Sequence, residues 1–148
     1  MTLLSLADRV LEPTTRGRAL AWTLADLALA ANVAGYAFDL YQRAWWFDRV
    51  LHAGTILAIT FWLALFVCAR SLHPRNGRSI LGMFLLACVG IALGALWEVG
   101  EWGADLVLPG DVIKGKNDTV MDLIMDTAGA LAGAAAGDGA GAGTSDIR

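Results

Sequence analysis

Four long apolar segments, separated by short polar stretches, make up most of the chain. They run from Ala19 to Phe38, from Val50 to Ala69, from Ser79 to Trp97 and from Thr119 to about Gly137. Each is close to the roughly 20 residues that a helix needs to cross about 30 Å of hydrocarbon. Helices are predicted because a segment in lipid must satisfy its own backbone hydrogen bonds. The pattern predicts an all-α polytopic membrane protein, with four transmembrane helices in a compact bundle.

Three regions follow from this pattern. We expect residues 1–18 to form a cytoplasmic or interfacial N-terminal segment, residues 19–136 the four-helix transmembrane domain, and residues 137–148 a flexible cytoplasmic tail rich in glycine and alanine. The beginning of the chain resembles a signal peptide, because basic residues precede an apolar run. Asp26 interrupts that run, so we interpret it as a retained first helix.

Composition agrees with a membrane protein. Of the 148 residues, 57% are hydrophobic and only 17% are charged, whereas soluble domains carry about 25% charged residues. The formal net charge of −3 and the lack of a Lys/Arg stripe argue against a nucleic-acid partner. Cys68 and Cys88 each lie in an apolar run, which predicts packed thiols rather than a disulfide or a metal site.

The distribution of basic residues predicts the orientation of the chain. Seven of the eleven Lys and Arg residues lie in the N-terminal segment, in the loop between the second and third helices, or in the tail. The positive-inside rule then places both termini in the cytoplasm and the protein in the cytoplasmic membrane. The opposite ends of the helices, which carry Trp45, Trp46, Trp97 and Trp102 as an aromatic belt, would face the outer leaflet.

Acidic residues gather at this predicted outer end. A carboxylate at the centre of a membrane helix costs about 2.5–3.5 kcal/mol on insertion scales, so such residues are rarely incidental. Within each helix they are three or four residues apart, which puts them on one helix face. The set comprises Asp48 and His52 in the second helix, Glu98 and Glu101 in the third, and Asp118, Asp122 and Asp126 in the fourth. Small residues at four-residue steps, Gly90/Gly94 and Gly129/Gly133, predict close helix contacts around them.

Three stretches resemble motifs of the YjdF-like family of inner-membrane proteins. Residues 47–52 (FDRVLH) are similar to its aromatic-Asp-Arg-x-x-His motif, and residues 97–102 (WEVGEW) to its aromatic-Glu-x-x-Glu-Trp motif. Residues 118–131 resemble its Asp-x-x-x-Asp and Gly-Ala-Leu stretch. The resemblance covers residues 39–134 and implies an architecture and site positions, but no reaction. A more distant likeness is to VanZ-like proteins, which share a helix-two Asp/His pattern and a Gly-rich last helix.

One interpretation of the acidic site is a bound divalent cation. His52, Glu98 and Glu101 would hold the ion, with Asp48 and Asp122 as further ligands or as groups that orient the ligands. Mixed imidazole and carboxylate donors suit Zn, Mn or Fe, and a set dominated by oxygen suits Mg or Ca. Such an ion could bind lipid headgroups or activate water against them. Arg49, Asp118 and Asp126 would complete the site around the ligands.

Two other interpretations remain open. The protein could conduct protons or cations along the fourth-helix acids and Asp26. It could instead be a non-catalytic accessory subunit in which the polar groups only fix helix packing. In that case Asp48 and Asp118 would cap helices, Arg49 would pair with Glu101, and His52 with Glu98. The expected partners are the lipid bilayer and either a second copy of the chain or a larger membrane complex.

Overall fold

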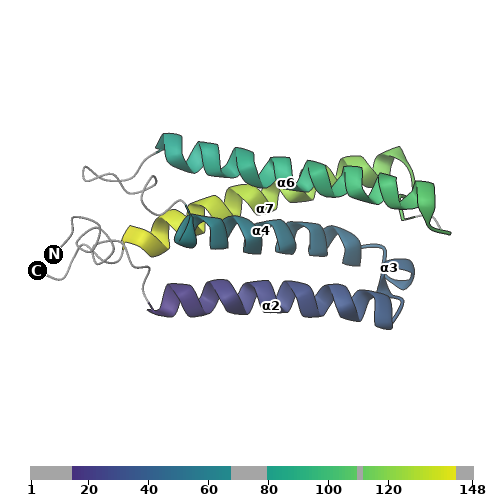
Figure 1. Ribbon diagram of the computed structural model, residues 1–148, viewed down its shortest axis with the longest axis horizontal. Helices are drawn as coiled ribbons and strands as arrows, with labels where there is room; N and C mark the ends of the chain where they lie inside the picture. The colour runs from purple at the N-terminus through teal and green to yellow at the C-terminus, as the bar shows by residue number, and fades with distance from the viewer. Residues whose placement is uncertain (1–14, 68–79, 110–111, 143–148) are drawn as a thin grey trace, which may run out of the picture.

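Four long helices dominate the structure, a computed structural model that describes residues 15–67, 80–109 and 112–142. These helices are α2 (Thr15–Ala37), α4 (Phe47–Phe66), α6 (Ile80–Val107) and α7 (Lys116–Ala142), and neighbours in sequence run antiparallel (Figure 1). A single turn, α3 (Leu40–Arg43), connects α2 to α4. The described residues form no strand, and all four long helices are long and apolar enough to cross a membrane. The predicted all-α fold with four membrane helices is therefore confirmed.

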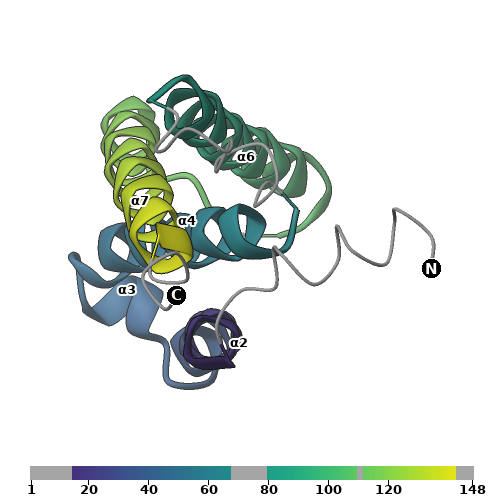
Figure 2. The ribbon, with the colours of Figure 1, turned by 90° about the vertical axis from the view of Figure 1, so that its left-hand side faces the viewer.

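Helix α4 lies at the centre of the bundle. It packs against α2, α6 and α7, and its contact with α7 is the most extensive in the structure. Helices α2 and α6 lie on opposite sides of α4 (Figure 2). The side chains of α4 therefore reach three neighbouring helices, which makes it the element that positions the others.

The buried core is narrow and consists mainly of small side chains. One cluster joins α4, α6 and α7 through Ala64, Leu86, Ala87 and Ala134. A second joins α2 to α4 through Ala21, Phe61 and Leu65. Most large apolar side chains point outward instead, as expected where the surrounding medium is as apolar as the core.

Glycines set the distance between α7 and its neighbours. A methyl group at Gly133 would lie 2.6 Å from the carbonyl oxygen of Leu57 on α4, and one at Gly129 would overlap the carbonyl oxygen of Ala53. On α6, a methyl group at Gly94 would lie 2.6 Å from Cβ of Asp126. The predicted close approach at these small residues is confirmed, and it brings polar side chains of α7 into the bundle interior.

Two helices extend beyond their predicted ends. Helix α6 continues to Val107, ten residues past Trp97, because no proline interrupts it before Pro109. Helix α7 continues to Ala142, into the region expected to be a flexible tail, although Gly137, Gly139 and Gly141 are poor helix formers. Residues 1–14 and 143–148 lie outside the described residues.

The two cysteines were expected to be packed thiols. Cys88 is a free thiol, but it is exposed on α6 rather than packed. It lies on the outward surface of the helix, where apolar side chains meet lipid rather than a protein core. Cys68 lies outside the described residues.

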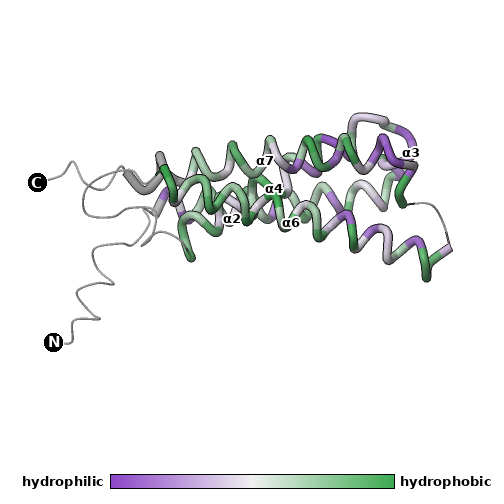
Figure 3. Tube along the Cα trace, turned by 90° about the horizontal axis from the view of Figure 1, so that it is seen from above, coloured by the Kyte–Doolittle hydropathy of each residue, from purple (hydrophilic) through white to green (hydrophobic). Residues whose placement is uncertain are grey.

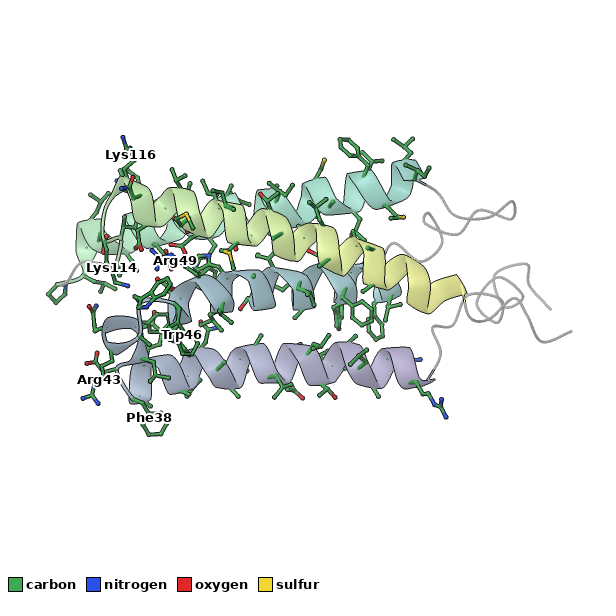
Figure 4. The ribbon with its side chains drawn as sticks, turned by 180° about the vertical axis from the view of Figure 1, so that it is seen from behind. Phe38, Arg43, Trp46, Arg49, Lys114 and Lys116 are labelled. Carbon is green, nitrogen blue, oxygen red and sulfur yellow. The ribbon has the colours of Figure 1, made fainter. Side chains whose placement is uncertain are left out.

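Polar residues concentrate at the end of the bundle that carries α3 (Figure 3). The chain turns there through Asp39, whose φ of 57° is left-handed, and through Gly115, whose φ is 121°. Aspartate tolerates the left-handed conformation better than most residues, and glycine adopts it freely. The side chains of Phe38, Arg43, Trp46 and Lys116 also lie at this end (Figure 4).

Candidate functional site

The eight predicted site residues all come from the end of the bundle next to α3. The beginning of α4, the end of α6 and the beginning of α7 meet there because the helices alternate in direction (Figure 1). Side chains three or four residues apart share a helix face, so each set is delivered as a group. Helix α4 supplies Asp48, Arg49 and His52, α6 supplies Glu98 and Glu101, and α7 supplies Asp118, Asp122 and Asp126.

The imidazole of His52 lies at the centre of the site and is only 6% exposed. Its Nδ1 atom is 3.1 Å from Oδ1 of Asp126 and 3.7 Å from Oε1 of Glu98. On the other side of the ring, Nε2 is 3.8 Å from Oδ1 of Asp48 and 3.9 Å from Oε1 of Glu101. One histidine therefore faces four carboxylates from three helices.

The contact with Asp126 determines which ring nitrogen of His52 is available. At 3.1 Å it is a hydrogen bond, whereas the other three contacts are longer than a hydrogen bond. In the neutral imidazole, a proton on Nδ1 that is donated to Asp126 leaves the lone pair on Nε2. The free lone pair then points toward Asp48 and Glu101.

Several carboxylate oxygens of the site are buried without a hydrogen-bond partner among the described residues. They are both oxygens of Glu98, Oδ1 of Asp122 and Oδ2 of Asp126, in side chains that are 6%, 2% and 1% exposed. An unsatisfied buried polar group costs about 1–3 kcal/mol, and more when it is charged. Such a site is stabilised by a cation or by protons.

The carboxylates divide into two groups whose donor atoms are close enough to share an ion. His52, Glu98 and Glu101 offer donors within 4.8 Å of one another, and so do Asp48, Asp118 and Asp122. Donors bound at 2.0–2.2 Å to one metal ion lie roughly 3–4 Å apart, so small side-chain movements would suffice. Of the five predicted metal ligands, Asp48 and Asp122 thus fall in the second group, although Asp48 also faces His52.

Basic side chains compensate only the second group. Nη2 of Arg49 lies 3.7 Å from Oδ1 of Asp118, and Nζ of Lys114 lies 3.6 Å from Oδ2 of Asp48. Among the described residues, no lysine or arginine forms an ion pair with Glu98, Glu101 or Asp126. The predicted pairing of Arg49 with Glu101 is wrong, because the guanidinium is held instead by Asp118, the backbone oxygen of Trp45 and the Trp45 ring.

Of the two residues of the helix-capping interpretation, only Asp118 accepts a backbone N–H from a described residue, and that N–H belongs to a residue before α7 rather than to its first turn. Oδ2 of Asp118 accepts the backbone N–H of Lys114, just before α7 begins. Asp48 lies in the first turn of α4, where it faces His52 and Lys114. Asp26 is exposed on α2, so it does not extend the buried stripe of α7 acids.

Residues of α2, α3 and the loop before α7 that sequence reasoning missed complete the site. The hydroxyl of Tyr41 donates to Oδ1 of Asn32 at 3.0 Å, and Nζ of Lys114 donates to the carbonyl oxygen of Tyr41 at 3.0 Å. On α6, Trp97 of the predicted aromatic belt also contacts the site, because its indole N–H donates to Oε1 of Glu101 at 2.9 Å. A polar Asn32 within an apolar span was the one sequence signal for this part of the site.

Tyr41 keeps its proton in this setting. Burial raises the pKa of its hydroxyl above the ordinary value, and the nearby Tyr36, Asp48 and Glu101 raise this pKa further. The neutral hydroxyl is therefore a hydrogen-bond donor at any physiological pH. It links α3 to α2 and holds the turn next to the carboxylates.

Comparisons with known proteins agree with this architecture. Residues 9–141 match the family described as predicted membrane protein (DUF2238). The chain is 31% identical over 94 residues to an "Uncharacterized protein" from Thermotoga maritima, an alignment that covers 62% of this chain and 47% of the relative. The chain thus spans about half the length of that relative. No solved structure matches the chain.

The family match covers most of the chain, including all four long helices except Ala142, the last residue of α7. It agrees with the helix lengths and apolar surfaces, which are those of a protein that spans a bilayer. The chain belongs to the DUF2238 family of predicted membrane proteins.

Proposed function

We propose that this protein is a YjdF-like protein of the cytoplasmic membrane that binds a divalent cation through His52, Glu98 and Glu101. The observation that carries the proposal is Glu98, which is 6% exposed, has no lysine or arginine beside it among the described residues, and has Oε1 3.7 Å from Nδ1 of His52. A carboxylate in this setting needs a positive partner. The described structure provides no lysine or arginine there, and a cation shared with His52 and Glu101 would satisfy it.

The donor set supports a transition metal or zinc. It combines one imidazole nitrogen with carboxylate oxygens, which suits Zn, Mn or Fe better than an all-oxygen set would. Asp126 would orient the imidazole through Nδ1, as second carboxylates do for many metal-binding histidines. Asp48 and Asp122 would be further ligands or orienting groups, with Arg49 and Asp118 fixing the neighbouring acids.

The proposed orientation places the site near the outer leaflet. The distribution of basic residues favours cytoplasmic termini, and the site lies at the end of the bundle opposite Arg16 and Arg18. Trp45, Trp46, Trp97 and Trp102 are all exposed around this end, as in the aromatic belts found at lipid headgroups. A metal held there would act on or bind headgroups, supplying a Lewis acid that polarises an ester or phosphate oxygen.

A second candidate function is that of an accessory subunit without chemistry. It is favoured by the ion pairs that link different elements, such as Arg49 with Asp118 and Lys114 with Asp48. Polar pairs between membrane helices contribute about 0.6 kcal/mol each on average. These pairs account for the second group of acids, but none of them brings a lysine or arginine to Glu98. The likeness to VanZ-like proteins remains a prediction, and so does the assembly with a second copy of the chain or with a larger membrane complex.

Metal content tests the proposal. We expect near-stoichiometric metal in detergent-purified wild-type protein after reconstitution with Zn, Mn, Mg or Ca. His52→Ala and Glu98→Gln each remove a donor, so the variants should lose most of the metal while circular dichroism shows the same helix content. The matched control is Asp39→Asn, because Asp39 is exposed and, within the described part of the chain, forms an ion pair only with Arg43. Metal absent from the wild type under every condition, or retained by both variants, would contradict the proposal.

A further inference from the structure

A cavity of about 150 Å³ lies beside α4, with walls from α2 on one side and α6 on the other. Its lining changes in character along α4. Asp48 and His52 form one end, together with Asp126 from α7, and Ile56 and Ile59 form the other. From Asp48 to Ile59 the cavity follows α4 for roughly 16 Å at 1.5 Å per residue. The cavity is therefore amphipathic along its length.

The edge of this cavity lies on the outward surface of the bundle. Tyr36 on α2, Ile59 on α4 and Trp97 on α6 line it, and they are 75%, 39% and 51% exposed. Helices α2 and α6 lie on opposite sides of α4 (Figure 2), so this outward side lies between two transmembrane helices. In a bilayer the cavity would be reached sideways, from the lipid.

Aromatic rings surround the polar end. Tyr36, Tyr41 and Trp97 line the cavity, and the rings of the two tyrosines have centroids 4.9 Å apart. A second cavity of about 220 Å³ adjoins it, shares both tyrosines with Asp48 and Glu101, and adds Lys114. Aromatic faces beside carboxylates are the surroundings in which proteins bind ammonium groups.

The charge of the site favours a positive ligand. Six carboxylates face Arg49 and Lys114, so the basic side chains compensate only part of the negative charge of the site. Asp48 and Glu101, which line both cavities, would repel a simple anion. An ammonium group is complementary to them. Lys114 lines the second cavity with its Nζ 3.6 Å from Oδ2 of Asp48, and it suits a phosphate.

From these observations we infer that the two cavities bind a membrane lipid whose phosphate headgroup carries an amine. The ammonium group lies among Tyr36, Tyr41 and Trp97 and pairs with Asp48 and Glu101. An alkyl chain follows Ile56 and Ile59 out to the bilayer, beside Leu93 of α6. The inference rests on the chain spanning the membrane, and it does not require the metal proposed above.

Photo-crosslinking tests this inference. The probe is a phosphatidylethanolamine with a diazirine on its alkyl chain, added to the purified protein in nanodiscs. We expect labelled peptides from α4 near Ile59 and from α6 near Leu93. Unlabelled phosphatidylethanolamine should compete at about tenfold lower concentration than phosphatidylglycerol, because only the former carries an ammonium group for the aromatic and acidic end. Equal competition by the two lipids, or stronger competition by phosphatidylglycerol, would overturn the inference.

Two pairs of variants make the test specific. Leu93→Trp fills the cavity and should abolish labelling, whereas Leu96→Trp, on the exposed face of the same helix, should not. Tyr36→Leu should reduce the preference for phosphatidylethanolamine, and Tyr36→Phe should keep it because the ring remains. Labelling unchanged by Leu93→Trp and Tyr36→Leu would sink the inference.

Metal analysis of the same samples separates the two proposals. Leu93 and Tyr36 are not metal ligands, so their variants should lose lipid while keeping metal. A wild-type protein that contains no metal but prefers phosphatidylethanolamine would support the lipid site and contradict the metal site.

Discussion

Replacing Gly129 with alanine is expected to give the largest loss of stability of any single methyl group added to this protein. The new Cβ would overlap the carbonyl oxygen of Ala53 and lie 3.0 and 3.1 Å from its C and Cα atoms. These are backbone atoms of α4, so no rotamer change can relieve the contact. Helix α7 would have to move away, and overpacking of this kind costs about 1–3 kcal/mol.

The matched control is Gly54→Ala on α4, where a Cβ would have no neighbour within 4 Å. Alanine is the better helix former, so this variant should be as stable as the wild type or slightly more stable. Unfolding in detergent, followed by circular dichroism on heating, gives the comparison. Equal midpoints for Gly129→Ala and Gly54→Ala would show that the α4–α7 contact is not as tight as the structure has it.

Replacing Asp126 with asparagine is expected to have the largest effect on metal binding among changes that leave His52, Glu98 and Glu101 in place. The carboxylate is 1% exposed and accepts from Nδ1 of His52, so its loss frees the imidazole to rotate and to change tautomer. Removing such orienting groups typically costs about 10–100-fold in metal affinity. Competition with a chelator of known affinity measures the change.

Gly94→Ala should also weaken metal binding, although it removes no donor atom. Its methyl group would lie 2.6 Å from Cβ and Cγ of Asp126, forcing that carboxylate away from His52. Gly100→Ala, further along α6 and without neighbours within 4 Å, is the control. A chelator should lower the unfolding temperature of the wild type and of Gly100→Ala, because a ligand that binds only the folded state stabilises it. If the chelator does not change the unfolding temperature of the wild type, His52 and its carboxylates form a structural cluster rather than a metal site.

The sequence pattern was informative where one physical requirement dominates. Crossing hydrocarbon requires apolar length, so the four spans were predictable. The end of α6 was not, because hydropathy falls at Glu98 and Glu101 while the helix continues to Val107. Helix formation requires only the absence of a breaker, and Pro109 is the first one after this segment.

The partners within the site depended on packing that spacing alone does not reveal. Steps of three and four residues correctly placed each set of acids on one helix face. This spacing did not indicate which carboxylate forms a hydrogen bond with His52. In the structure it is Asp126 rather than Glu98. That choice depends on how closely α7 approaches α4 and α6, which Gly129, Gly133 and Gly94 determine. The position of Lys114 depended on a loop, and only the fold brings it beside Asp48.

The exposed carboxylate of Asp26 has a consequence for how the protein enters the membrane during synthesis. Asp26 lies midway along α2, whose span is less apolar than that of α4 or α6, and a charge there costs about 2.5–3.5 kcal/mol on insertion scales. Helix α2 leaves the ribosome before α4 and packs on it through Ala21, Phe61 and Leu65. We expect α2 to stay at the translocation channel until α4 has been synthesised, and then to enter the lipid together with α4 as a helical hairpin. Shortening the chain before α4 would then leave α2 uninserted.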